Sequence, residues 1–178
     1  LTLCHSSDND ICDSSTDRRD PADKGLSEFG REVVAECNRL GMIVDISHAS
    51  EKSISDILAV TKAPIIASHS SARALCDNPR NLTDDQLRAL AKNGGVVQIC
   101  FLAAYVKTPP VIPEREKAMK ELEAKYGNIR QIQDEAVRTK AMAEREAVNQ
   151  KFPQVRADVQ DLVDHIDHVK RVVGVDYA

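Results

Sequence analysis

Four short apolar runs divide the first hundred positions of the chain. They lie at residues 1–5, 42–46, 65–67 and 96–101, and polar, glycine or proline residues border them. Short runs with turn signals at both ends are typical of buried strands. Because the runs are apolar along their length rather than alternating, we expect both faces of the resulting sheet to be covered, as in a parallel sheet.

Segments with helical periodicity and capping signals separate these runs. Ser27 and Ser50 are placed as N-caps, Gly41 as a helix-ending glycine, and Thr83 with Gln86 as a capping box. The three predicted helices carry apolar stripes: Phe29, Val33, Cys37 and Leu40; Ile54, Ile57 and Leu58; Leu87 and Leu90. Alternating strands and helices predict an α/β fold with a parallel sheet.

The second half of the chain departs from this alternation. Three prolines near 109–113 precede a stretch rich in Lys, Glu, Arg and Ala. We interpret residues 109–154 as a charged helical insertion with a solvated surface rather than a binding surface. A last helix then carries Val159, Leu162, Val163, Ile166 and Val169, and residues 175–178 resemble the approach to another strand. The polar loop at 6–24 is long enough to be functional or disordered.

Charge and composition narrow the function classes. The 178 residues carry 28 acidic and 24 basic side chains, a net charge of -4, and no basic stripe. Nucleic-acid binding is therefore not expected. No apolar run approaches the ~20 residues of a transmembrane helix, so none is expected in this chain. The start, LTLCHSSDND, has neither an initiator Met nor a signal peptide and resembles the middle of a longer chain.

Histidines follow three of the predicted strands. His5, His48 and His69 all stand where an apolar run ends. The carboxyl ends of parallel strands carry the chemistry of α/β barrels, so three histidines at equivalent positions favour a shared site. Imidazole suits zinc. A Ser-His nucleophile is the competing interpretation, because serines flank His48 and His69, but the chain has no G-x-S-x-G motif.

Two more histidines and one arginine complete the candidates. His165 and His168 stand among three aspartates on the last helix. We expect them on a solvated outer face, paired with aspartates, rather than in a metal site. Arg80 follows the third strand within a loop, where most arginines are solvated, and the pattern alone does not single it out.

Several long blocks resemble one enzyme family. LTLCH, GLSEFGREVVAECNRLGMIVDISHAS, PIIASHSSARALCDNPRNLTDDQLRALAKNGGVVQICF and VDHIDHVKRVVGVDYA occur in the order found in the membrane dipeptidase (renal dipeptidase) family of zinc metallopeptidases. The resemblance implies a (β/α)8 TIM barrel in which metal-activated hydroxide cleaves dipeptides, some containing D-residues, with two zinc ions in the intact site. It implies that His48 and His69 bind one zinc, that His5 is catalytic and contacts the substrate, and that Arg80 binds the substrate carboxylate.

The resemblance also defines what this chain lacks. The H-x-D motif of the family's first strand, the bridging glutamate of its third strand and its D-F-D-G block are not found in this chain, whose H-I-D at residues 165–167 belongs to the last predicted helix. Residues 1–178 are therefore expected to be a partial barrel covering about strands four to seven, inactive by itself. Where the family often has V-N-F, this chain has Ile99-Cys100-Phe101, which places any polar role at that position in doubt.

The remaining expectations separate into alternatives and context. Another metal-dependent, amidohydrolase-like barrel hydrolase and a metal-less, non-enzymatic barrel relative are the two alternatives to a dipeptidase. By resemblance alone, a periplasmic or exported location is favoured over the cytoplasm, and a homodimer is compatible with the family. Five cysteines at irregular spacing, without a C-x-x-C motif, do not distinguish an oxidising from a reducing cellular compartment.

Overall fold

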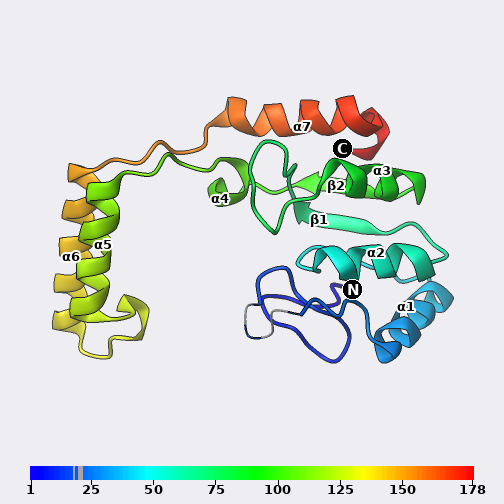
Figure 1. The fold of residues 1–178 in the computed structure, drawn as a ribbon, viewed down its shortest axis with the longest axis horizontal. Helices are drawn as coiled ribbons and strands as arrows, with labels where there is room; N and C mark the ends of the chain where they lie inside the picture. The colour runs from blue at the N-terminus through cyan, green and yellow to red at the C-terminus, as the bar shows by residue number, and fades with distance from the viewer. Residues whose placement is uncertain (18, 20–21) are drawn as a thin grey trace. The chain divides into compact units, whose positions relative to one another are not determined.

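The computed structural model describes residues 1–17, 19 and 22–178 (Figure 1). Residues 18, 20 and 21, which belong to the predicted 6–24 loop, lie outside the described residues. The chain divides into two compact units. The first comprises residues 1–108 and 157–178 and contains all of the histidines; the second comprises residues 109–156.

A small parallel sheet organises the first unit. Strand β1 (Ile66–Ser70) pairs in parallel with β2 (Val96–Ile99). Asp45 forms parallel bridges to Thr2 on one side and to Ile66 on the other. The chain segments therefore lie in the order Thr2, Asp45, β1, β2, all running the same way, and the predicted parallel α/β arrangement is confirmed.

Three of the four predicted strands are longer than the observed ones. Residues 1–5 and 42–46 contribute one bridging residue each, Thr2 and Asp45, rather than extended strands. Strand β2 ends at Ile99, before Phe101, which is 78% exposed. Strand length depends on the neighbour that supplies hydrogen bonds, and an apolar run by itself does not reveal that neighbour. Strand β1 instead extends beyond the predicted 65–67 to Ser70, so that His69 lies inside the strand, one residue before its carboxyl end.

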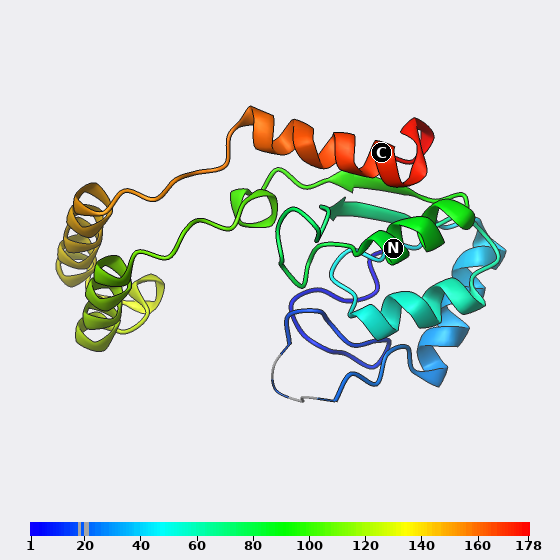
Figure 2. The same cartoon turned by 45° about the horizontal axis from the view of Figure 1, so that its top comes forward.

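Three helices connect these segments, with caps as predicted. Helix α1 (Glu28–Leu40) begins at Ser27, whose side chain accepts the Gly30 N–H, and ends at Gly41 in the left-handed region. Helix α2 (Glu51–Val60) has Ser50 as its N-cap, and α3 (Asp84–Lys92) has the Thr83–Gln86 capping box. Each helix packs against the next, α1 on α2 and α2 on α3 (Figure 2). The predicted α1 stripe is partly wrong, because Phe29 and Leu40 are exposed.

The last helix buries a different side from the one that its apolar stripe predicts. After the short α4 (Ala103–Val106), helix α7 (Val159–Val173) packs against α3 and β2, and residues Val175–Tyr177 form a 3-10 turn. Val159 and Ile166 from the predicted apolar stripe are exposed, whereas His165 and His168 are buried. The prediction that these histidines are solvated is therefore wrong.

Polar partners explain why α7 buries its histidines. The Ala72 N–H donates to His165 Nδ1 at 3.0 Å, and His165 Nε2 donates to the Val106 carbonyl at 2.8 Å. His168 Nε2 contacts an Asp84 carboxylate oxygen at 2.7 Å, so its acidic partner comes from α3 rather than from α7 itself. A buried imidazole with both ring nitrogens bonded carries little desolvation cost.

The core of the first unit lies between the sheet and its helices. It includes Val44, Ile46, Ile57, Ile65, Leu82, Leu87, Leu90, Val97 and Val169. All five cysteines are free thiols, and four of them are buried, where cysteine behaves as a small hydrophobic residue. In the described part of the chain, no helix is long and apolar enough to cross a membrane.

The second unit is a helical hairpin. Helix α5 (Pro113–Tyr126) leads through the 3-10 turn η1 (Ile129–Gln131) to α6 (Glu135–Lys151). Lys125 Nζ lies 2.8 Å from a Glu144 carboxylate oxygen, and Arg115 donates to the Asn149 side chain at 3.1 Å. These pairings run in opposite directions along the two helices, so α5 and α6 are antiparallel and largely solvated.

Candidate active site

Three histidines converge at the carboxyl end of the sheet. His48 Nε2 lies 2.9 Å from His69 Nε2, and the His5 ring stacks on the His48 ring with 3.9 Å between centroids. Each histidine follows or ends one of three adjacent parallel segments. The order of the segments in the sheet thus brings His5 together with His48 and His69, which follow it by 43 and 64 positions in the sequence.

His48 adopts a strained backbone conformation. Its φ is 79°, and among the described residues no other non-glycine residue has a positive φ. This left-handed region costs a residue with a Cβ about 1–2 kcal/mol. The His48 carbonyl accepts the Ser15 N–H at 2.8 Å, which helps to hold the turn. Such strain concentrates at functional sites, and here it accompanies a ring directed at His69.

The local environment keeps the paired imidazoles neutral. Burial, followed by the positive charge of Arg80, lowers the pKa of His48 to about 4. The same two causes, burial first, lower the pKa of His69. Neutral imidazole is the form that binds metal ions. Both rings are therefore in the ligating form at neutral pH.

The pair fits one end of a zinc site. Two nitrogens that bind one tetrahedral zinc at ~2.0–2.1 Å are roughly 3.3 Å apart, so the observed separation of 2.9 Å needs to open only slightly to admit the ion. Among the described residues, no group of three or more His, Cys, Asp or Glu side chains is arranged to hold a metal ion. The described chain thus brings together two candidate ligands, His48 and His69, and not a complete set.

A buried carboxylate lies behind these two histidines. Asp45 Oδ1 accepts the N–H groups of Ser47 and Ser68, at 2.9 and 3.0 Å. Asp45 Oδ2 accepts the hydroxyls of Thr2 and Ser68, at 2.8 and 2.6 Å. Burial would raise the pKa of Asp45, but these hydrogen bonds outweigh it and hold the pKa below its usual value. Asp45 was not identified as a candidate from the sequence. The signal that could have done so is its place in Asp45-Ile46-Ser47-His48, three residues before a candidate histidine.

The serine beside His69 is not arranged as a nucleophile. Ser68 Oγ lies 2.7 Å from His69 Nδ1, which is the contact that a Ser-His pair would need. However, the Ser68 hydroxyl donates its single proton to Asp45, so His69 is not positioned to remove it as a base. This geometry disfavours the Ser-His interpretation.

Arg80 is a buried cation next to the histidines. It is 3% exposed, and its Nη2 donates to the His69 carbonyl at 3.3 Å. Its guanidinium lies over the Tyr105 ring, 5.3 Å from the centroid. Nε is buried without a hydrogen-bond partner, and no described carboxylate forms an ion pair with Arg80. Burial lowers the pKa of Arg80, so an incoming anion would relieve an unfavourable environment.

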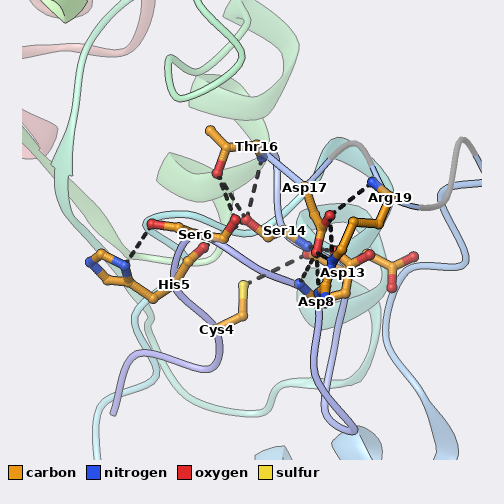
Figure 3. Close-up of polar contacts among 9 residues, drawn as sticks. All are labelled: Cys4, His5, Ser6, Asp8, Asp13, Ser14, Thr16, Asp17 and Arg19. Carbon is orange, nitrogen blue, oxygen red and sulfur yellow. Dashed lines mark hydrogen bonds and ion pairs between the residues drawn. The ribbon is translucent and has the colours of Figure 1, made fainter. Parts of the chain in front are cut away.

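The loop after His5 is ordered by its own side chains (Figure 3). Ser14 Oγ donates to the His5 carbonyl at 2.6 Å, and Asp8 accepts the Ser14 N–H at 2.7 Å. The His5 ring remains exposed, with Nδ1 2.9 Å from Ser6 Oγ. These bonds fix the His5 backbone while leaving its ring accessible.

Comparison with known proteins identifies the family of this chain. The family model described as "Membrane dipeptidase (Peptidase family M19)" matches residues 1–178. An uncharacterized dipeptidase of Schizosaccharomyces pombe is 46% identical over 110 residues, which are 61% of this chain and 26% of that protein. The chain therefore spans about a quarter of the length of the curated relative it matches.

Two solved structures described as dipeptidases resemble this chain, as does an amidohydrolase from Pseudomonas aeruginosa with a TM-score of 0.64 at 25% identity, covering 97% of this chain and 38% of that one. The probable dipeptidase PvdM from Pseudomonas aeruginosa superposes with a TM-score of 0.74 at 30% identity, covering 99% of this chain and 48% of that one. Dipeptidase AC, described as a metallopeptidase of family M19, superposes with a TM-score of 0.57 at 27% identity, covering 86% of this chain and 32% of that one. On its residues and its fold, this chain belongs to the membrane dipeptidase family, peptidase family M19.

Proposed function

We propose that the protein carrying this chain is a zinc-dependent dipeptidase whose substrates include dipeptides with D-residues, and that residues 1–178 form part of its (β/α)8 barrel. The observation that carries the proposal is the convergence of His48 Nε2 and His69 Nε2 beside a buried Arg80 without a carboxylate partner among the described residues. Family membership and the metallopeptidase description of dipeptidase AC support it.

The proposed roles follow from position. His48 and His69 would hold one of two zinc ions; when bound, zinc lowers the pKa of water, so that hydroxide is available near neutral pH. His5, stacked on His48 and exposed, would contact the substrate near the scissile bond. The Ser6 contact occupies His5 Nδ1 and leaves Nε2 for a hydrogen bond to the substrate.

Arg80 would bind the C-terminal carboxylate. Its guanidinium has five N–H donors, of which one is used on the His69 carbonyl. A carboxylate can accept two of the others in a fork, a geometry that suits arginine. Because Arg80 is anchored to the backbone of His69, the carboxylate would be held a short way from the metal ligands. That spacing favours short peptides with a free C-terminus.

We expect Arg80→Ala in the full-length protein to raise KM for dipeptides while leaving zinc content unchanged. Loss of a charge-assisted hydrogen bond should cost about 1.5–3 kcal/mol in kcat/KM. Dipeptide amides, which lack the carboxylate, should lose little. Steady-state kinetics on matched acid and amide substrates, with metal analysis, measure both effects.

Arg88→Ala is the matched control, because Arg88 is an exposed arginine on α3 that pairs only with the neighbouring Asp85 in the described chain. It should behave like the parent. Equal losses on acid and amide substrates would assign Arg80 a structural role. A parent that cleaves cyclic amides but not dipeptides would favour the amidohydrolase-like alternative, and one that binds no zinc would favour the non-enzymatic relative.

A further inference from the structure

We propose that Asp45 and Ser68 are positioning residues for His69. In this arrangement the Ser68 hydroxyl connects the Asp45 carboxylate to His69 Nδ1 and fixes the tautomer in which His69 Nε2 carries a free lone pair. The importance of that lone pair rests on the proposed function, in which His69 is a zinc ligand. The tautomer itself is a property of the metal-free chain.

The location of Asp45 makes it a rigid anchor. Its backbone bridges Thr2 on one side and Ile66 on the other, so it sits within the parallel sheet. The residue is 7% exposed, and its side chain accepts four hydrogen bonds, two on each carboxylate oxygen. Two of these come from backbone N–H groups, which have no freedom to turn away. The carboxylate is therefore fixed in orientation.

Counting protons along the chain of contacts gives the tautomer. An ionised carboxylate only accepts, so the Ser68 hydroxyl donates to Asp45 across the 2.6 Å contact. The other acceptor within reach of Ser68, Ser47 Oγ, is farther away at 3.5 Å. With its one proton used, Ser68 Oγ can only accept from His69, at 2.7 Å, which places the imidazole proton on Nδ1. A neutral ring then has its lone pair on Nε2, the atom facing His48.

A further hydrogen bond holds the backbone of the ligand. The His69 N–H donates to Ser47 Oγ at 3.0 Å, and the Ser47 N–H donates to Asp45. Asp45 therefore supports His69 through both its ring and its main chain. His48 differs, because its Nδ1 is buried without a partner among the described residues. Partners that orient metal-binding histidines are typically worth 10–100-fold in metal affinity.

Asp45→Asn tests the direction of the relay. The amide oxygen must stay where Oδ1 now accepts two backbone N–H groups, so the amide nitrogen takes the place of Oδ2. That nitrogen donates to Ser68, whose hydroxyl then turns its proton toward His69 Nδ1. We expect the His69 proton to move to Nε2, where it would block metal binding. A residue with a merely structural role would not reverse the tautomer.

The experiment uses the full-length protein with 15N-labelled histidine. Long-range 1H–15N NMR of the metal-free protein assigns the His69 tautomer, with His69→Gln identifying its signals, and chelator competition measures zinc affinity. Ser68→Ala should weaken zinc binding 10–100-fold, and Ser68→Thr, which keeps the hydroxyl, should restore it to within a few-fold. Thr2→Val is the matched control, because Thr2 also donates to Asp45 Oδ2 but does not contact His69.

The expected result is an Nδ1–H tautomer in the parent and in Thr2→Val, an Nε2–H tautomer in Asp45→Asn, and weaker zinc binding in Asp45→Asn and Ser68→Ala alone. An Nε2–H tautomer in the parent, or an unchanged tautomer in Asp45→Asn, would overturn the proposal, as would equal zinc losses in Ser68→Ala and Thr2→Val. Failure of the zinc role alone would appear differently, as His69→Gln keeping full zinc content while the tautomers follow the expected pattern.

Discussion

Replacing His48 or His69 with alanine in the full-length protein is expected to release close to one equivalent of zinc and to remove most dipeptidase activity. The two Nε2 atoms converge to 2.9 Å, so we expect both to bind the same ion. Zinc sites use three or four protein ligands, and losing one leaves an ion poorly held. Two-metal sites act as a unit, so loss of one ion should remove activity rather than reduce it in proportion.

Metal analysis of the purified variants, beside the parent, measures the effect directly. His48→Asn is an informative second variant, because asparagine tolerates the left-handed backbone of that position and removes only the imidazole. It should lose zinc as His48→Ala does. Full zinc retention in either His69→Ala or His48→Asn would refute the assignment of these residues as ligands.

His165→Ala should produce a large loss of stability and leave zinc binding intact. The imidazole is fully buried and bonds the Ala72 N–H and the Val106 carbonyl, both of which are themselves buried. Alanine would leave two buried polar groups unpaired, at about 1–3 kcal/mol each. We therefore expect the free energy of unfolding to fall by about 2–5 kcal/mol.

Denaturant unfolding with parallel metal analysis separates stability from metal binding. Asp167→Ala provides the control, because Asp167 is exposed on the same helix, and surface changes of this kind usually stay within about 0.5 kcal/mol. If His165→Ala unfolded at the same denaturant concentration as the parent, the two hydrogen bonds would have no net role. Loss of zinc from a folded His165→Ala would place that residue in the metal site instead.

Local signals in the sequence predicted local structure well. The caps at Ser27, Ser50 and Thr83 and the ending at Gly41 are confirmed, because a cap is specified by residues within one turn of the helix. The meeting of His5, His48 and His69 also followed from sequence, since parallel strands place their carboxyl ends at one edge. Their roles as ligands and substrate contacts stay predictions.

Features that depend on distant contacts were not readable in this way. The periodicity of α7 marked valine and isoleucine positions as its buried stripe, but α3 and the loop at Ala72 supply polar partners that bury His165 and His168 instead. Asp45 lies inside an apolar run, and the hydroxyl groups that donate to its side chain come from the distant residues Thr2 and Ser68. No pattern within a few residues of Asp45 reports those donors.

A salt bridge joins the two chain segments of the first unit that flank the helical hairpin. Lys107 Nζ lies 2.8 Å from both carboxylate oxygens of Asp161. Lys107 precedes the second unit, residues 109–156, in the chain, and Asp161 follows it. Because its ends are joined in this way, the segment 109–156 is a closed loop. Doubling the length of such a loop costs only about 0.6 kcal/mol in closure entropy. The size and sequence of this segment can therefore vary widely while the histidine site remains folded.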